Sequence, residues 1–140
     1  MIVLVDTTIW SLALRRRPHS LSNDEKLLVL EWTRLVQSGE AVLIGPIRQE
    51  ILSGIREERT FEAIRESLGD FRYLEIHPND YDQAAHFFNR CRAHGIAGTS
   101  IDLLLCAVAH RVEVPVFTTD PDFGYYAPHT GIRLHQPPRL

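Results

Sequence analysis

Four carboxylates stand where apolar runs end or where helical segments begin. They are Asp6, Glu50, Asp102 and Asp120. Two of them follow strand-like runs, and the other two lie about one turn into segments with a helical pattern. Carboxylates that converge repel one another unless a cation offsets their charge, and burying them unpaired is costly. Mg2+ suits such a set, because it takes hard oxygen ligands, keeps several waters and also binds substrate phosphate.

Apolar, β-branched runs that alternate with helical segments predict the elements that position these acids. Short continuous runs of this kind are typical of strands buried on both faces of a parallel sheet. The runs are Ile2–Val5, Ala41–Ile44, Arg72–Ile76, Val114–Thr118 and, more weakly, Ile132–Leu134. Right-handed crossovers make such a sheet mostly parallel, and sites then form at the carboxyl ends of its strands. We predict a single domain over residues 1–140, with an α/β fold in which a mostly parallel five-stranded sheet is the middle layer of a three-layer α/β/α sandwich.

Start signals for helices fall between these runs. Ser22 and Glu25 have the spacing of a capping box. Thr99 or Ser100 can cap the most apolar segment, whose first turn contains Asp102. Two segments without a clear pattern are expected to be loops, Arg15–Ser20 and Pro121–Gly131.

The composition excludes several function classes. The 15 basic and 18 acidic residues give a formal net charge of -3, so any attraction to phosphate must be local. Lys26 is the only lysine, so the chain lacks the lysine near the last strands on which a phosphoacceptor receiver domain depends. Neither G-x-G-x-x-G nor G-x-x-x-x-G-K-[ST] occurs, which disfavours a nucleotide-binding module. The seven histidines show no ligand spacing tied to the acids, so zinc fits less well than magnesium.

The start of the chain and its cysteines indicate a compartment. The opening apolar run meets Asp6 at once and has no basic segment before it, so it does not read as a signal peptide. No apolar run approaches the roughly 20 residues that span a bilayer. Cys91 and Cys106 are expected to be buried thiols rather than a disulfide. We therefore expect a soluble, cytoplasmic protein with no membrane partner.

Four segments of the chain, in register, resemble a known family. They read Val-Asp-Thr-Thr-Ile-Trp at 5–10, Pro-Ile-Arg-Gln-Glu-Ile-Leu-Ser-Gly at 46–54, Ser-Ile-Asp-Leu-Leu-Leu-Cys-Ala-Val-Ala at 100–109 and Val-Phe-Thr-Thr-Asp-Pro-Asp-Phe at 116–123. The pattern looks like a PIN domain and more narrowly resembles VapC, the toxin of bacterial and archaeal toxin–antitoxin pairs. The resemblance implies a five-stranded parallel sheet and a ribonuclease that depends on Mg2+ or Mn2+. It carries over Asp6, Glu50, Asp102 and Asp120 as the catalytic metal site, with Asp122 as an auxiliary acid.

Hydroxyl side chains beside the acids are candidates for supporting roles. Thr7 follows Asp6, and Thr118 and Thr119 precede Asp120. Each threonine could hydrogen-bond a carboxylate, although threonine is also a natural residue at strand ends.

Basic and aromatic side chains are candidates for contacts with RNA. The only dense basic run consists of Arg15, Arg16 and Arg17. It could contact phosphates, or it could form a solvated loop. Tyr125 and Tyr126 could stack on bases, as could Trp10, although Trp10 suits the core better.

The resemblance also implies a mechanism and partners. One or two ions would activate water for in-line attack on an RNA phosphodiester, leaving a 5′-phosphate and a 3′-hydroxyl. Since the 2′-hydroxyl takes no part, single-stranded DNA is not excluded. A small antitoxin would insert a segment into the acidic groove, where an arginine could compete with the metal. A homodimer, or a hetero-oligomer with the antitoxin, is also implied. Two alternatives stay open: a housekeeping PIN nuclease without an antitoxin, and a noncatalytic PIN-fold module that binds RNA or protein.

Overall fold

A four-stranded parallel sheet forms the centre of the chain. In the computed structural model, which describes residues 1–138, the strands are β1 (Val3–Val5), β2 (Ala41–Leu43), β3 (Arg72–Tyr73) and β4 (Val116–Phe117). Their order is β3-β2-β1-β4, and all three pairings are parallel. The strands fall inside the predicted runs, although β3 and β4 are only 2 residues long. Because β1 is central, the residue that follows it lies near the middle of the carboxyl edge.

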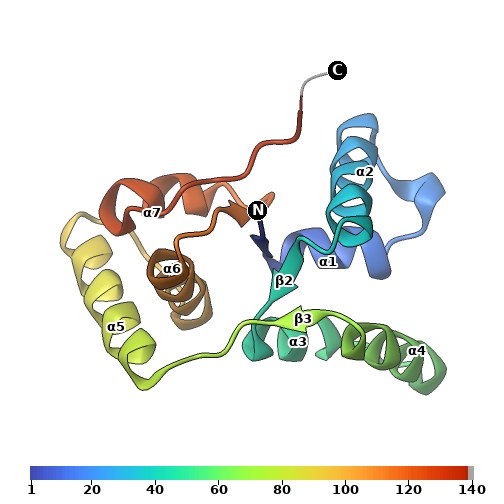
Figure 1. Ribbon diagram of the computed structural model, residues 1–140, viewed down its shortest axis with the longest axis horizontal. Helices are drawn as coiled ribbons and strands as arrows, with labels where there is room; N and C mark the ends of the chain where they lie inside the picture. The colour runs from blue at the N-terminus through green and yellow to red at the C-terminus, as the bar shows by residue number, and fades with distance from the viewer. Residues whose placement is uncertain (139–140) are drawn as a thin grey trace.

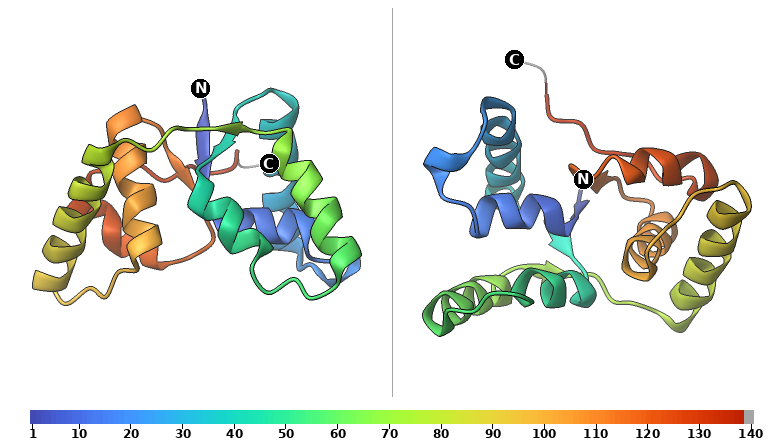
Figure 2. Two further views of the ribbon diagram at one scale, coloured as in Figure 1. Left: turned by 90° about the horizontal axis from the view of Figure 1, so that it is seen from below. Right: turned by 180° about the vertical axis from the view of Figure 1, so that it is seen from behind.

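Helices cover both faces of this sheet. They are α1 (Thr7–Leu14), the 3₁₀ helix η1 (Pro18–Ser20), α2 (Asn23–Gln37), α3 (Gly45–Leu52), α4 (Glu58–Gly69), α5 (Pro78–Ala93), α6 (Ser100–Val112) and α7 (Asp122–Thr130). Figure 1 shows α5, α6 and α7 on one side of the sheet and α1 to α4 on the other, and the views in Figure 2 agree. The predicted α/β/α sandwich is therefore confirmed.

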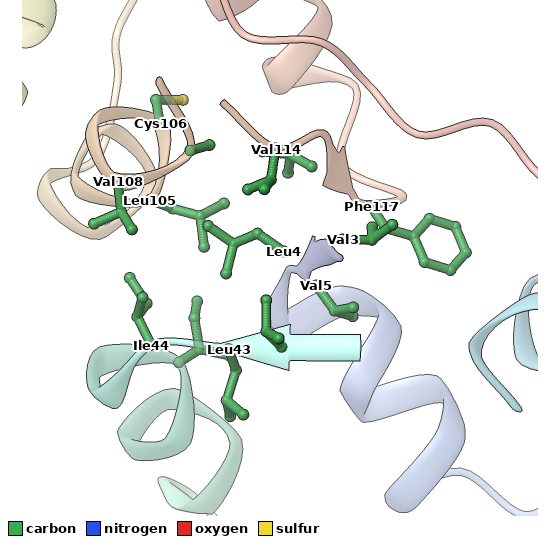
Figure 3. Close-up of a cluster of buried hydrophobic side chains, with 14 of the residues drawn as sticks. Val3, Leu4, Val5, Leu43, Ile44, Leu105, Cys106, Val108, Val114 and Phe117 are labelled. Atoms are coloured by element: carbon green, nitrogen blue, oxygen red, sulfur yellow. The ribbon is translucent and has the colours of Figure 1, made fainter. Parts of the chain in front are cut away.

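The core is built around β1, in which every side chain is buried. Leu4 and Val5 are completely buried, and the apolar helix α6 contributes Leu105 and Val108 from the opposite layer. Figure 3 shows side chains of β1, β2 and α6 gathered in one cluster. Since burying one such side chain stabilises the fold by about 1.5–3 kcal/mol, this cluster holds the strand ends firmly in place.

The predicted fifth strand at Ile132–Leu134 is wrong in extent. The segment makes one isolated parallel bridge, between Leu134 and Val116. The His135 N–H then donates to the Val116 carbonyl at 2.8 Å. Pairing ends there because Pro137 and Pro138 follow, and proline has no N–H for a further ladder bond.

The segment Pro121–Gly131, which was predicted to be a loop, contains helix α7. Its glycines and the internal Pro128 weaken the helical pattern in the sequence. Packing overrides this low propensity, because Phe123 and Tyr126 are completely buried and α7 contacts both α5 and α6. Gly131 ends the helix at φ 73°, a left-handed conformation that favours glycine.

Two predicted helix starts are confirmed. Ser22 and Glu25 form a reciprocal capping box at α2, with hydrogen bonds of 2.9 and 3.1 Å. Thr99 caps α6, because its hydroxyl accepts a hydrogen bond from the Asp102 N–H at 3.1 Å. The two cysteines are free and buried, as predicted. Within residues 1–138, no helix has both the length and the apolar character needed to cross a membrane.

Candidate active site

One depression collects the four carboxylates that the sequence singled out. It has a volume of about 540 Å3 and lies beside the ends of β1 and β4. Its lining consists of Asp6, Thr7, Thr8, Glu50, Thr99, Ser100, Ile101, Asp102 and Asp120. The acids come from four places: the end of β1, helix α3, the first turn of α6 and the segment after β4. The topology of the sheet thus brings together acids that are far apart in the sequence.

Asp6 is the most buried of these acids, with 4% of its surface exposed. It lies between β1 and α1, and its N–H donates to the Phe117 carbonyl at 2.9 Å. Its Oδ2 accepts hydrogen bonds from the hydroxyls of Thr118 at 2.7 Å and Thr8 at 3.0 Å. Burial nevertheless raises the pKa of Asp6, and the hydrogen bonds oppose this increase only in part. Its negative charge is therefore costly until a cation is near.

Two threonine hydroxyls join the ends of β1 and β4. Thr118 Oγ1, besides donating to Asp6, accepts a hydrogen bond from the Asp120 N–H at 3.0 Å. Thr8 Oγ1 accepts one from the Thr119 N–H at 3.0 Å. Thr119 thus contributes its backbone, and its side chain is exposed. The sequence reasoning missed Thr8, although a hydroxyl two residues after an acid is a known local hydrogen-bonding pattern.

Glu50 is held from α1. The Thr7 hydroxyl donates to Glu50 Oε1 at 2.6 Å, which is the kind of contact expected of Thr7. Helix α3 begins at Gly45, just after β2, with Pro46 in its first turn. Glu50 lies little more than one turn into this helix and so stays near the carboxyl end of β2. This placement, rather than residue type, distinguishes Glu50 from the other glutamates of the chain.

Asp102 lies in the first turn of α6 and is partly buried. Its Oδ2 accepts a hydrogen bond from the Tyr126 hydroxyl at 3.1 Å. The pKa of Asp102 is raised to about 6, first by burial and then by the negative charges of Asp6 and Asp120. Hydrogen bonds from Thr99 and Tyr126 act in the opposite direction. The acids in the depression therefore interact electrostatically, as the sequence pattern predicts.

The donors in this depression fit a hard divalent cation. Among residues 1–138, no arginine, lysine or histidine lines it, so no basic side chain neutralises the acids there. Within the same range, no three His, Cys, Asp or Glu side chains are already close enough together to form a complete metal cage. Mg2+ does not need such a cage, since it is usually bound through one or two carboxylates and keeps several waters.

Other predicted residues lie around the depression rather than in its lining. Asp122 is in the first turn of α7, where its N–H donates to Asp120 Oδ1 at 2.9 Å. Arg15, Arg16 and Arg17 are exposed after α1. Arg16 donates to the Ser20 carbonyl, which holds this basic segment in a compact turn.

The aromatic candidates have three different environments. Trp10 is completely buried and donates to the Val5 carbonyl at 3.0 Å, so it belongs to the core. Tyr126 is also completely buried, and the prediction that it could stack on bases is wrong. Tyr125 is 63% exposed. Neighbouring residues of a helix point in different directions around its axis, so one of these two tyrosines is buried and the other exposed. A predicted loop gives no such distinction.

The fold and the depression together define an α/β protein with an acidic site at the carboxyl edge of a parallel sheet. A family model described as PIN domain matches residues 3–127, and the chain belongs to this family. PIN domains are generally nucleases, and they generally use divalent metal ions. The resemblance stated from the four sequence motifs is confirmed at the level of the family.

Solved structures with the same fold cover almost the whole chain. A chain of FitAcB from Neisseria gonorrhoeae has a TM-score of 0.74 at 18% identity, covering 97% of this chain and 98% of that chain. A chain of VapBC2 from Rickettsia felis, bound to a promoter DNA fragment, has a TM-score of 0.72 at 15% identity, with coverages of 96% and 98%. A toxin–antitoxin complex from Klebsiella pneumoniae gives 0.65 at 15% identity, with coverages of 99% and 99%. A search among curated proteins gives no match.

Proposed function

We propose that this protein is a metal-dependent endoribonuclease and the toxin of a toxin–antitoxin pair. The observation that carries the proposal is the convergence of Asp6, Glu50, Asp102 and Asp120 on one depression lined by no basic side chain in residues 1–138. Membership of the PIN domain family supports nuclease chemistry. The similarity to structures of VapBC2 and of a toxin–antitoxin complex supports the narrower role.

The four acids would hold Mg2+, or Mn2+ in its place, with Asp122 as an auxiliary acid. When bound, the cation supplies Lewis acidity that activates water and neutralises charge on the phosphodiester. The chain itself fixes the carboxylates: Thr118 and Thr8 orient Asp6, and Thr7 orients Glu50. These hydroxyl donors are neutral, so they do not compensate the negative charge of the carboxylates as a basic side chain would. That charge is therefore available to attract a cation.

Substrate contacts outside the depression would come from Arg15, Arg16 and Arg17. Helix α1 begins next to Asp6 and ends at Leu14. Eight residues at about 1.5 Å each place the basic run about 12 Å along the helix axis from the acid. An RNA strand that crosses the depression could reach this run, and its phosphates would be attracted to it.

The partners and setting are also part of the proposal. A small antitoxin would insert a segment into the acidic depression, where an arginine would compete with the cation for the carboxylates. The chain would act as a homodimer, or in a hetero-oligomer with the antitoxin. Residues 1–140 would form a single PIN domain that works in the cytoplasm, where its RNA substrates lie.

The direct test is cleavage of total cellular RNA by the purified protein with Mg2+ or Mn2+ and with EDTA. We expect cleavage that needs the cation and that is abolished by Asp6→Asn. The matched control is Asp82→Asn, which removes the same charge from an exposed position on α5 and should leave cleavage unchanged. Cleavage in EDTA, or full activity of Asp6→Asn, would contradict the mechanism. No cleavage by the folded wild type would favour a noncatalytic PIN module.

The toxin role of this chain has a separate test. Expression of the chain alone in bacteria should arrest growth, and Asp6→Asn should relieve the arrest. Active enzyme that does not impair growth would favour a housekeeping nuclease over a toxin.

A further inference from the structure

Tyr126 is a polar side chain behind the acidic depression rather than in its lining. It lies on α7 and is completely buried. Its ring packs edge to face on Phe123, with ring centroids 5.2 Å apart. Gly98 also approaches it closely: a Cβ at that position would lie 3.5 Å from the ring and only 2.8 Å from Leu103. The ring is therefore enclosed by its own helix and by the loop before α6, and it has little freedom to turn.

The hydroxyl of this enclosed ring reaches Asp102. It donates to Oδ2 at 3.1 Å, while the Asp102 N–H is held by Thr99. Oδ2 is thus fixed by a neutral donor on a buried ring, and Asp102 itself lines the depression.

Helix α7 supports a second acid at its start. The Asp122 N–H donates to Asp120 Oδ1 at 2.9 Å, and Tyr126 lies about one turn further along the same helix. A single helix therefore contacts two of the four acids from outside the depression. Its position sets the direction of Asp102 and Asp120 together.

We propose that Tyr126 is a positioning residue for the divalent cation, acting through the orientation of Asp102. The proposal rests on the metal site of the proposed function. Partners that orient metal-binding side chains typically change metal affinity by about ten- to hundredfold when removed. Tyr126→Phe deletes the hydroxyl and keeps the packed ring. Tyr125→Phe is the matched control, because it deletes the same group from the adjacent, 63% exposed tyrosine.

The test measures Mn2+ binding to the RNA-free protein by electron paramagnetic resonance and by calorimetry. We expect Tyr126→Phe to weaken binding about tenfold or more, Tyr125→Phe to leave it unchanged, and Asp102→Asn to weaken it at least as much as Tyr126→Phe. In the Asp102→Asn background, Tyr126→Phe should have almost no further effect, because the two residues act through one carboxylate. High Mn2+ concentrations should restore RNA cleavage by Tyr126→Phe.

The possible results separate this proposal from the proposed function. If the wild type binds no Mn2+, or binds it equally well after Asp102→Asn, the metal site itself is refuted. If Asp102→Asn weakens binding but Tyr126→Phe does not, only the role of Tyr126 is refuted. Loss of the cooperative unfolding transition in Tyr126→Phe would also overturn it, since the hydroxyl would then be a structural group.

Discussion

Replacing Asp102 by asparagine removes one negative charge from the acidic depression and keeps the shape of the side chain. The amide oxygen of the asparagine can still accept the hydrogen bond from Tyr126, and the backbone N–H can still donate to Thr99. In the folded protein the pKa of Asp102 is about 6, whereas its ordinary value is 3.8. The cause is burial first and the charge of Asp6 second. The substitution therefore tests whether the site is electrostatically destabilised without metal.

The sign of the effect follows from proton binding. Between pH 3.8 and about 6 the folded state holds the Asp102 proton more tightly than the unfolded chain does, so stability falls as the pH rises through this window. A carboxyl whose pKa rises this far on folding opposes folding by about 3 kcal/mol at neutral pH. Screening at a partly exposed site reduces this to about 1–2 kcal/mol. The substitution also removes the favourable interaction of this acid with the dipole of α6, which lowers the stability by about 0.3–1 kcal/mol and offsets part of the gain.

Asp102→Asn should consequently raise the free energy of unfolding of the metal-free protein by about 1 kcal/mol at pH 7.5, which corresponds to about 3 °C in Tm for a chain of this size. At about pH 3, where the carboxyl is mostly protonated in both the folded and the unfolded state, the gain should nearly vanish. Urea denaturation in EDTA at the two pH values measures this, with Asp82→Asn as the control. Adding Mn2+ should reverse the order at pH 7.5, because the wild type binds the cation more tightly than the variant and therefore gains more binding free energy, about 2.7 kcal/mol at one hundred times its Kd. Destabilisation of Asp102→Asn at pH 7.5 in EDTA would refute the electrostatic reasoning.

Two further substitutions test the hydroxyl support of the site and a carboxylate outside it. Thr118→Val keeps the side-chain shape but removes the hydroxyl that donates to Asp6. The affinity for Mn2+, measured by calorimetry, should therefore fall about tenfold or more. Unchanged affinity would exclude a supporting role for Thr118. Glu31 is 4% exposed and its pKa is lowered, first by the hydrogen bond from Arg34, so its stabilising effect is complete above about pH 4.5 and is lost as the pH falls below that value. In urea titrations, Glu31→Gln should therefore lower the free energy of unfolding by about 1–3 kcal/mol at pH 7 and by little at about pH 3. Equal losses at both pH values would show that the charge of Glu31 does not contribute to stability.

The central elements and the four acids were predictable from sequence because each has a local signal. β1 is a continuous apolar run that ends in Asp6, and Thr99 precedes the helix that contains Asp102. The parallel topology then fixes which strand ends share an edge. The convergence of the acids was therefore a geometric consequence that needed no knowledge of side-chain packing.

The support around the acids could not be read in the same way. Tyr126 looked like a loop residue because Pro128 and the nearby glycines hide the helix, and only packing against α5 and α6 determines its burial. The hydrogen bond between Thr7 and Glu50 joins residues from separate helices, and its geometry depends on how α1 and α3 pack. The fifth strand failed for a related reason, since its single bridge depends on where the chain returns to β4.

Buried carboxylates outside the depression are neutralised by arginine. Asp80 accepts two hydrogen bonds from Arg111, at 2.8 and 3.0 Å. Burial acts to raise the pKa of Asp80, but these bonds and one from the His77 backbone outweigh it and hold the pKa below its usual range. Glu31 is treated in the same way by Arg34, with hydrogen bonds of 2.6 and 2.9 Å. Their charge is used within the fold and is not available to a ligand.

The acids of the depression are held by a different kind of donor. Asp6 and Asp102 accept hydrogen bonds from hydroxyl groups, and the pKa of each is raised rather than lowered. A hydroxyl fixes the direction of a carboxylate without supplying a positive charge, so the protein alone relieves the electrostatic cost of burial only in part. The same chain satisfies Asp80 and Glu31 with arginine, so it has the means to neutralise a buried acid. Because no arginine among the described residues lines the depression, unfavourable negative charge is concentrated there, and a cation bound as proposed would relieve it.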